Sequence, residues 1–396
     1  MNKKPLVLAY SGGLDTSYCL KKLSSEGYEV HAVSVNTGGF SKAEINSIKE
    51  KAYHMGAHVY ENIDALSSFY DHIVKYLIFG NILKNNTYPL SVSAERIIQA
   101  IEIVRYANRI GAKFIAHGST GAGNDQVRFD LIFQVMAPEI EIITLIRDHQ
   151  LSREDEIAYL KSQGIDMAWE KAQYSVNQGL WGTSVGGSET LTSNLPLPAK
   201  AYPSALKNKK TTQISIGFEK GEIATLNGKK GDSVDLIQEL QEIAKSYAIG
   251  RDIHVGDTII GIKGRVGFEA AAPLIILKAH HLLEKHTLTK WQLFQKEQLG
   301  NFYGMLLHEG NYLDPVMRDI EAFLQSSQTH VSGTVMVALH PFRFELLGIQ
   351  SDHDLMQAKF GSYGEMNKAW TASDAKGFIK ITANAHKIFK SVNKSI

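Results

Sequence analysis

The stretch "VLAYSGGLDTSYCL", Val7–Leu20, decides the fold because a glycine pair separates an apolar run from a helix-like run. The apolar run at 5–10 is bounded by turn formers and predicts a strand. Leu14–Glu26 carries apolar residues at helical spacing and ends at Gly27, so a helix follows. A turn between a parallel strand and a helix lies at the carboxyl end of the strand, where open α/β sheets bind ligands.

The turn itself, Ser11–Ser17, has the groups that a phosphate requires. Its two glycines permit close backbone approach and positive φ. The helix start supplies free N–H groups and the positive end of the helix dipole, and the serines and threonine add hydroxyl donors. The turn lacks the Gly-Lys-Ser/Thr sequence of a P-loop. It therefore predicts a phosphate site that works without that lysine.

The first 165 residues repeat this alternation, which implies a parallel sheet with helices on its faces. The predicted strands are 5–10, 28–36, 57–63, 113–116 and 140–145. The predicted helices are 14–26, 41–55, 94–110, 124–136 and 152–162, the last with a capping box that begins at Ser152. The sequence therefore predicts an α/β domain here.

The pattern changes after about residue 166. Residues 177–198 are rich in Gly, Ser, Asn and Pro and predict a long ordered loop or a domain junction. The elements predicted next are an antiparallel meander at 211–232, a helix at 234–247, a strand at 257–268, a helix from 279 past 298, and two strands at 330–349. Ser373–Val392 has an apolar helical stripe, which is typical of a subunit arm or a docked lid.

The composition is that of a globular protein, with 44% hydrophobic residues and 42 basic against 41 acidic side chains. This balance gives no argument for a nucleic-acid partner. Cys19 is the only cysteine, which excludes an intrachain disulfide and favours a reducing, cytoplasmic setting. "MNKKPLVLAY" predicts a strand rather than a signal peptide. No apolar stretch approaches the length of a membrane span, so we expect no membrane partner.

A second string, "AHGSTGAGNDQVRFD" at Ala116–Asp130, also links a predicted strand to a predicted helix. Asn124, Asp125 and Arg128 fall at helical spacing beside a glycine-rich turn. An arginine can bind a carboxylate bidentately, and an aspartate can hold an ammonium group. The string therefore fits a site for two amino-acid-like substrates, although on its own it would favour a helix start with solvated polar residues.

The sequence Ser-Gly-Gly-x-Asp-Thr-Ser resembles the pyrophosphate-binding motif of the ATP pyrophosphatase superfamily. Members of that superfamily cleave ATP between the α and β phosphates and pass AMP to a carbonyl or ureido oxygen. The resemblance accounts for the missing lysine. The amides and hydroxyls of the turn would hold the departing pyrophosphate, and Mg²⁺ is expected to accompany ATP and supply positive charge.

Together the two strings resemble the argininosuccinate synthase family, in which "AYSGGLDTS" and "HG-x-TG-x-GNDQVRF" occur in this order. Family-like segments continue in "YPLSVS" (88–93), "YSVNQGLWGTS" (174–184), "GIKGR" (261–265) and "VSGTV" (331–335). The resemblance implies a parallel-sheet nucleotide-binding domain of the adenine nucleotide α-hydrolase type at 1–165. An α+β synthetase domain would follow at 166–365 and a C-terminal helical arm at 366–396. The implied assembly is a cytoplasmic homotetramer.

The resemblance also implies a reaction. The ureido oxygen of citrulline attacks the α-phosphate of ATP, and pyrophosphate leaves. The α-amine of aspartate then attacks the ureido carbon and expels AMP, which yields argininosuccinate for arginine biosynthesis. Orientation of three substrates would supply much of the acceleration. No residue is assigned as a general acid or base, and neither a protein-bound metal nor a prosthetic group is expected.

The same resemblance implies the site residues. ATP would contact Ala9, Tyr10, Ser11, Gly12, Gly13, Leu14, Asp15, Thr16 and Ser17, with the adenosine near Val35 and Gly118. Aspartate would contact Thr120, Asn124 and Asp125. Citrulline would contact Tyr88, Ser93, Asn124, Arg128, Ser175 and Ser184. Among these, Asn124, Asp125 and Arg128 are expected to orient the substrates.

Departures from the family pattern concern the acceptor. Gly256 and Phe268 stand where the family has a Glu and a Tyr that serve the α-amino end of citrulline, and Gly186 replaces another Glu. An unpartnered ammonium in a buried site costs about 1–3 kcal/mol or more. Three interpretations stay open. The alignment shifts and Asp257 or Glu189 compensates, the citrulline binds differently, or the acceptor is an N-acylated citrulline for which Gly256 widens the pocket.

Two other hypotheses compete with this one. The chain could be another adenylating enzyme, such as an ammonia-dependent amide-forming synthetase or a nucleic-acid thiolase, or a nucleotide-binding regulatory module. Cys19 is predicted to be a core thiol, which disfavours enzymes that need a nucleophilic cysteine. The second substrate string argues against a sensor of ATP alone.

Histidines could also suggest metal chemistry. His280, His281 and His286 lack a matching carboxylate cluster in the sequence, so we expect packed or solvated side chains. His117 adjoins the nucleotide turn and could touch a phosphate, but no catalytic role is expected for it.

Overall fold

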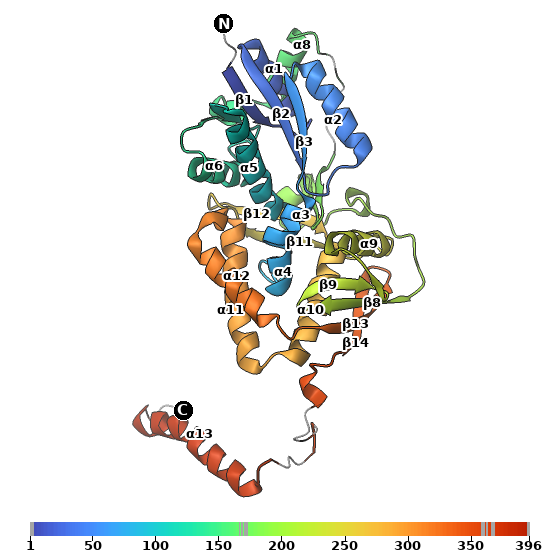
Figure 1. Cartoon of the computed structure of the whole chain (residues 1–396), viewed down its shortest axis with the longest axis vertical. Coiled ribbons are helices and arrows are strands. Elements are labelled where there is room, and N and C mark those ends of the chain that lie inside the picture. The colour runs from blue at the N-terminus through green and yellow to red at the C-terminus, as the bar shows by residue number, and fades with distance from the viewer. Residues whose placement is uncertain are drawn as a thin grey trace.

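The computed structural model describes residues 4–165, 167, 169, 173–357, 361, 363–365 and 369–393. An upper body, a lower body and a separate C-terminal helix follow one another along the long axis (Figure 1). The predicted boundary between the first two domains adjoins residue 166, and the predicted arm begins at residue 366. Both of these residues lie outside the described part of the chain.

The upper body is built on a five-stranded sheet in the order β3-β2-β1-β4-β5, and every neighbouring pair is parallel. Its strands are β1 (Lys4–Ala9), β2 (Tyr28–Asn36), β3 (Val59–Asp64), β4 (Phe114–Ala116) and β5 (Glu141–Ile143). Its helices are α1 (Leu14–Ser25), α2 (Lys42–Met55), α5 (Ser91–Ile110), α6 (Asp125–Met136), α7 (Leu145–Asp148) and α8 (Arg153–Ser162). The predicted α/β class is confirmed.

Side-chain alternation along β1 explains why helices cover both faces of this sheet. Leu6 and Leu8 are buried in a core cluster with residues of α1 and α2, whereas Val7 belongs to the cluster that contains the apolar face of α5. Successive residues of a strand point to opposite faces, so an apolar run such as "LVL" requires cover on each side. Helices on both faces leave the carboxyl ends of β1 and β4 uncovered, and the loops that follow these strands lie there.

The local predictions in this body hold closely. The strand predicted at 28–36 is β2, and the capping box of α8 forms between Ser152 and Asp155. Helix α5 begins at Ser91, earlier than the predicted residue 94, because Leu90 adopts a left-handed conformation with φ 62° and turns the chain directly into the helix.

The lower body contains two antiparallel sheets, in the orders β10-β9-β8-β13-β14 and β11-β12-β7-β6. The first consists of β8 (Thr212–Glu219), β9 (Glu222–Leu226), β10 (Lys229–Lys230), β13 (Gly333–His340) and β14 (Arg343–Gln350). The second consists of β6 (Ser175–Gly179), β7 (Gly182–Gly186), β11 (Arg251–Asp257) and β12 (Lys263–Glu269). The predicted meander and the two late strands lie together in the first sheet.

Helices fill the remainder of the lower body (Figure 1). They are α3 (Leu66–Phe69), a π-helical turn at Tyr70–Val74, α4 (Lys75–Phe79), α9 (Ser233–Lys245), α10 (Ala271–Thr287), α11 (Lys290–His308) and α12 (Pro315–Ser327). Short 3-10 turns lie at Ser188–Leu191, Ala199–Ala201, Asn311–Leu313 and Leu355–Gln357. The segment from α3 to α4 comes from the first half of the chain but packs against α10, α11 and α12, which ties the two bodies together.

Three predictions for the lower body were wrong in detail. Residues 177–198 are not only a loop, because a hairpin of β6 and β7 joins the second sheet. The strand predicted at 257–268 is a turn followed by β12, and the preceding strand β11 was missed. The helix predicted from 279 past 298 is two helices, because Thr289 forms a capping box with Gln292 and starts α11 anew.

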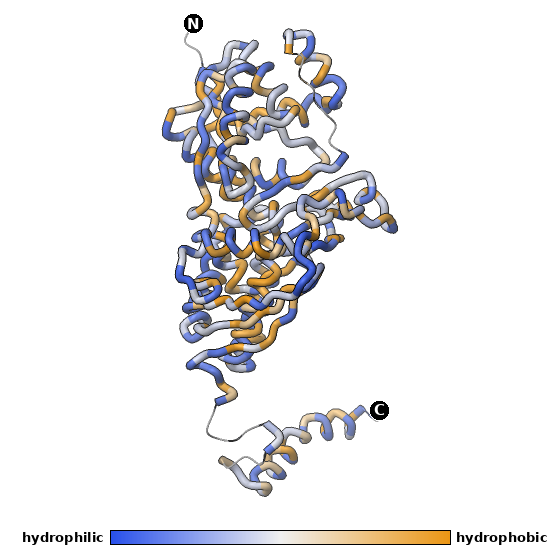
Figure 2. The backbone as a smooth tube through the Cα atoms, turned by 90° about the vertical axis from the view of Figure 1, so that its right-hand side faces the viewer, coloured by the Kyte–Doolittle hydropathy of each residue, from blue (hydrophilic) through white to orange (hydrophobic). Residues whose placement is uncertain are grey.

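Helix α13 (Ala372–Asn393) stands apart from both bodies (Figure 1). None of its described residues is buried, and its apolar side chains are well exposed, from 57% for Ile388 to 76% for Ile381. Figure 2 shows hydrophobic positions along this isolated helix. The predicted C-terminal helix is therefore confirmed, and it makes no docked lid on its own chain.

Candidate active site

The glycine-rich turn closes tightly onto the start of α1. Gly12 has φ 75°, a left-handed value that suits glycine, and Gly13 is the N-cap. The Ser11 hydroxyl accepts a hydrogen bond from the Gly13 N–H at 3.3 Å and lies 3.2 Å from the Thr16 hydroxyl. No side chain caps the helix, so its first N–H groups are left for a ligand. This arrangement is an anion site.

A lysine does reach the turn, but from another element. Lys51 of α2 donates from Nζ to the Gly12 carbonyl at 2.9 Å. Burial lowers the pKa of Lys51. Its ammonium group lies over the ring of Trp169, 5.3 Å from the ring centre. The lysine therefore fixes the backbone of the turn. Sequence reasoning missed it because nothing near Lys51 marks the contact.

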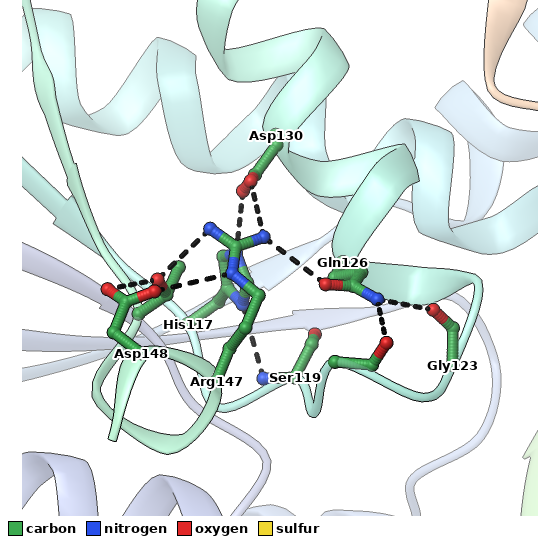
Figure 3. Close-up of polar contacts among 9 residues, drawn as sticks. His117, Ser119, Gly123, Gln126, Asp130, Arg147 and Asp148 are labelled. Carbon is green, nitrogen blue, oxygen red and sulfur yellow. Dashed lines mark hydrogen bonds and ion pairs between the residues drawn. The ribbon is translucent and has the colours of Figure 1, made fainter. Parts of the chain in front are cut away.

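A polar network fixes the loop that follows β4 (Figure 3). The Ser119 N–H donates to His117 Nδ1 at 3.2 Å, so Nε2 carries the hydrogen and donates to Asp130 at 2.8 Å. Arg147 donates to Asp130 at 2.7 Å and to Gln126 at 3.4 Å. Burial raises the pKa of Asp130, but His117 and Arg147 outweigh it and lower the pKa below its usual value.

The amide of Gln126 completes that network, since its Nε2 donates to the carbonyls of Gly121 and Gly123 at 2.6 and 3.1 Å. Gly118 lies directly against the turn, because a Cβ there would be 3.1 Å from Thr16 Cγ2 and 3.3 Å from the Asp15 carbonyl carbon. The second string and the glycine-rich turn thus form adjoining walls of one site. His117 orients the loop, which agrees with the absence of a predicted catalytic role.

The polar side chains of the second string, Ala116–Asp130, are held in place by hydrogen bonds to one another and to neighbouring elements. Asp125 accepts from Arg96 Nε and from Arg128 at 2.9 Å each. Burial raises the pKa of Asp125, but the two guanidinium groups outweigh it and lower the pKa to about 2. Arg128 also donates to the His308 carbonyl at 3.0 and 2.8 Å. The Asn124 side chain accepts from the Ile259 N–H at 2.9 Å.

These contacts refine the expected roles. Asp125 stays charged and 40% exposed, so it can still meet a ligand, but two arginines already share its charge. Arg128 is buried, and three of its nitrogens already donate hydrogen bonds to the His308 carbonyl and to Asp125. A carboxylate would therefore bind this group as part of an existing network. Arg96 was missed by sequence reasoning, although it follows the family-like segment at 88–93.

One cavity of about 1110 Å³ joins the two strings to the lower body. It is lined by the predicted nucleotide residues Ala9, Tyr10, Ser11, Gly13, Leu14, Asp15, Thr16, Val35 and Gly118. It is also lined by the predicted substrate residues Tyr88, Ser93, Thr120, Asn124, Asp125, Arg128, Ser175 and Ser184. The fold therefore brings residues from both halves of the chain to one space.

Two predicted nucleotide residues do not line this cavity. Ser17 is fully buried behind the turn, where its hydroxyl lies 3.4 Å from the Tyr10 hydroxyl and its N–H donates to the Gly13 carbonyl at 3.0 Å. Gly12 supplies the sharp bend and turns its carbonyl toward Lys51. Both support the turn from behind.

Another cavity, of about 470 Å³ near Thr287 and His353, contains none of the predicted site residues.

Gly256 lines the large cavity at the end formed by β11, but the space beside it is filled. A Cβ at Gly256 would lie 2.7 Å from His254 Nε2, so the imidazole occupies the room that the missing side chain leaves. His254 stacks on Tyr88 with ring centres 5.2 Å apart. Phe268 is buried behind Tyr88, at 5.4 Å, and does not line the cavity. The expected widening of the pocket at Gly256 is therefore absent.

Neither suggested compensating acid is free at this end. Asp257 lines the cavity, but it pairs with Lys263 at 2.6 Å on an exposed rim. Glu189 accepts from the Tyr174 hydroxyl at 3.0 Å and is not among the lining residues. Gly186 lies in β7 and also does not line the cavity. His254 was missed by sequence reasoning, because its place depends on the pairing of β11 with β12.

Another unpredicted group is Glu95 of α5, which lines the cavity with only 1% of its surface exposed. The Thr37 hydroxyl donates to one carboxyl oxygen at 2.9 Å, and the other oxygen has no partner. Burial raises the pKa of Glu95 to about 8, although Arg96 opposes this. Glu95 is therefore held mainly uncharged at neutral pH.

Neither a reactive cysteine nor a metal site forms among the described residues. Cys19 is buried in the core, and burial raises the pKa of its thiol, as expected for a packing residue. His280 is buried between Asn81 and Gln328. Among the described residues, no group of three or more His, Cys, Asp or Glu side chains could hold a metal ion.

Comparisons with known proteins agree with this geometry. Residues 5–166 match the model described as "Arginosuccinate synthase N-terminal HUP domain", and residues 174–389 match "Arginosuccinate synthase C-terminal domain". The chain belongs to the argininosuccinate synthase family. The argininosuccinate synthase of Methanocaldococcus jannaschii is 38% identical over 91% of each chain, and that of Xanthomonas campestris is 34% identical over 100% of each. That of Pyrococcus furiosus is 36% identical over 95% of this chain and 92% of its own.

The family match covers both bodies and extends into α13. An argininosuccinate synthase fold thus accounts for the two strings, the shared cavity and the antiparallel second half. In the described part of the chain, no helix is long and apolar enough to cross a membrane.

Proposed function

We propose that this chain is the ATP-dependent ligase that joins citrulline and aspartate through a citrullyl-AMP intermediate, with release of AMP and pyrophosphate. The proposal rests mainly on the shared cavity of about 1110 Å³, in which the anion-binding turn and the Asn124–Arg128 network face the same space. Family membership supports the same chemistry. An enzyme that only bound or hydrolysed ATP would not need the Asn124–Arg128 network.

The first step follows from the turn. The free N–H groups at the start of α1 and the hydroxyls of Ser11 and Thr16 would hold the β and γ phosphates. The ureido oxygen of citrulline attacks the α-phosphorus, the bond to the bridging oxygen breaks, and pyrophosphate takes the electron pair. A site that stabilises the leaving group needs no lysine at the end of the turn.

Mg²⁺ fits this cavity as a partner of the nucleotide. Asp15 lines the cavity beside the turn, where its side chain also hydrogen-bonds Glu156, and carboxylate and phosphate oxygens are the ligands that Mg²⁺ prefers. Asp15 would hold the ion together with the phosphates, and the ion would supply positive charge for the departing pyrophosphate.

The second step needs aspartate beside the ureido carbon. Thr120, Asn124 and Asp125 are the proposed aspartate contacts, and Tyr88, Ser93, Asn124, Arg128, Ser175 and Ser184 are the proposed citrulline contacts. The α-amine attacks the ureido carbon, and AMP leaves with the oxygen that citrulline supplied. The network of Asp125 with two arginines supports a rigid, oriented site, and orientation can supply a large share of the acceleration.

The domain organisation and assembly belong to the same proposal. The proposed domains are 1–165, 166–365 and the arm 366–396, which we infer assembles a homotetramer. The exposed apolar stripe of α13 supports this, because a helix with Phe378 and Phe389 more than half exposed needs a partner surface. Use of ATP as a substrate supports a cytoplasmic location.

A substrate-omission assay tests the proposed reaction. AMP release is expected only with ATP, citrulline and aspartate together, while citrulline alone supports exchange of pyrophosphate into ATP. AMP release with ammonium in place of aspartate would instead indicate an amide-forming synthetase. ATP binding without any turnover would indicate a regulatory module.

A further inference from the structure

The part of the cavity around His254 has its own electrostatic character. Tyr88, His254 and Gly256 line it, and Lys84 adjoins it, since the backbones of Lys84 and Tyr88 are hydrogen-bonded at 2.8 and 3.1 Å. Within the proposed reaction, the ureido group of the acceptor must lie beside the turn, where the α-phosphate is attacked. We place the amino-acid head of the acceptor beside Tyr88 and Gly256, because the family pattern puts the head of citrulline at these positions.

Lys84 is a half-buried cation without an ion pair among the described residues. Burial lowers the pKa of Lys84, and Glu309 opposes this from nearby without pairing with it. Lys84 does not itself line the cavity, but its charge acts on two residues that do, since it helps burial to lower the pKa of both His254 and His308. A cation that is partly removed from water and left unpaired is the kind of group that an anionic ligand satisfies.

His254 adds a directed group next to this charge. Its ring is buried, stacked on Tyr88, and presents Nε2 to the space beside Gly256. Its other nitrogen, Nδ1, is buried without a partner. Asn85 holds the strand below it by donating to the Val255 carbonyl at 3.1 Å. The ring is therefore positioned by packing and available for a ligand.

Two acids that line the cavity here are already paired with basic side chains. Asp125 lies between Arg96 and Arg128, and Asp257 pairs with Lys263. Glu309 acts on Lys84 from nearby but is not among the residues that line the cavity, whereas Lys84 and Arg128 supply positive charge. This balance favours an anion over an ammonium group.

The geometry points to a carboxylate-binding subsite formed by Lys84 and His254, which recognises the acceptor substrate and sets its specificity. Lys84 supplies the charge and the His254 Nε2 a hydrogen bond. The carboxylate has two chemical sources, the α-carboxylate of citrulline itself or a carboxylate on an acyl group that blocks its α-amine.

The experiment compares four acceptors in steady-state AMP release with ATP and aspartate. They are citrulline, citrullinamide, N-acetylcitrulline and N-succinylcitrulline. The variant is Lys84→Gln, with His254→Asn as a second test of the same subsite. Lys245→Gln is the matched control, since it removes an exposed lysine on α9 that pairs only with Glu242.

If the subsite holds the α-carboxylate, Lys84→Gln raises KM for citrulline and N-acetylcitrulline about 10- to 100-fold and leaves citrullinamide unchanged. If it holds an acyl carboxylate, the unmodified enzyme prefers N-succinylcitrulline to N-acetylcitrulline, and Lys84→Gln abolishes that preference. In both cases kcat changes little, and Lys84→Arg retains the unmodified behaviour.

An unchanged KM for all four acceptors in Lys84→Gln and in His254→Asn overturns the subsite. That result differs from failure of the proposed reaction, in which the unmodified enzyme releases no AMP with any acceptor. A thermal unfolding curve for each variant shows that a changed KM does not come from loss of the fold.

Discussion

Gly118 offers the sharpest test of how the two strings form one nucleotide site. It follows β4 and lies against the turn of the other string, so a side chain there presses on the start of α1. In Gly118→Ala, the added Cβ would meet Thr16 Cγ2 at 3.1 Å, Thr16 N at 3.2 Å and the Asp15 carbonyl carbon at 3.3 Å.

The expected magnitude follows from those contacts. Carbon atoms pack best at about 3.5–4.0 Å, so all three contacts are too close. Two of them involve backbone atoms at the start of α1, which cannot rotate away. Overpacking of this kind costs about 1–3 kcal/mol. If the turn moves to relieve it, kcat/KM for ATP falls about 5- to 150-fold, since each 1.36 kcal/mol is a factor of ten.

Pyrophosphate release at varied ATP and saturating citrulline and aspartate measures this effect. Gly123→Ala is the matched control in the same loop, because a Cβ there meets nothing within 4 Å, and its kcat/KM should stay within about twofold. Neither glycine has a positive φ, so both variants test space rather than backbone strain. Equal values for the two variants would refute the claim that the strings adjoin at Gly118.

Other expectations concern charge, stability and assembly. Burial raises the pKa of Glu95 to about 8, so the stability from its protonated form is fully present below about pH 4.5 and is lost as pH rises to about 8. Glu95→Gln keeps the uncharged form, so the Tm difference between variant and unmodified enzyme should grow over that range; a flat difference contradicts it. Lys296→Met leaves the buried Glu284 carboxylate with its neutral hydrogen-bond partners but without its lysine, and should cost about 3–5 kcal/mol. Most of this loss should be recovered when Glu284→Gln is added, as thermal unfolding would show. Truncation before Ser373 should leave a smaller assembly by mass in solution, and an unchanged tetramer would exclude α13 as the arm.

The sequence by itself determined the features that depend on neighbouring residues. A strand, a glycine pair and a helix start in "VLAYSGGLDTSYCL" define an anion-binding turn, because the free N–H groups and the left-handed Gly12 are local properties. The strand–helix alternation and the capping box at Ser152 are local in the same sense. Most of the predicted site residues line the cavity because they belong to these two strings and to nearby family-like segments.

Only the tertiary structure decided what lies opposite those strings. Lys51 reaches Gly12 from α2, His308 engages Arg128 from α11, and Glu95 is isolated from water on α5. The chain alone marks Gly256 as a lost side chain, but the pairing of β11 with β12 puts His254 into its place. Such contacts join residues far apart in sequence, where no spacing rule operates. Burial and charge at the acceptor end therefore follow from the packing of the two bodies.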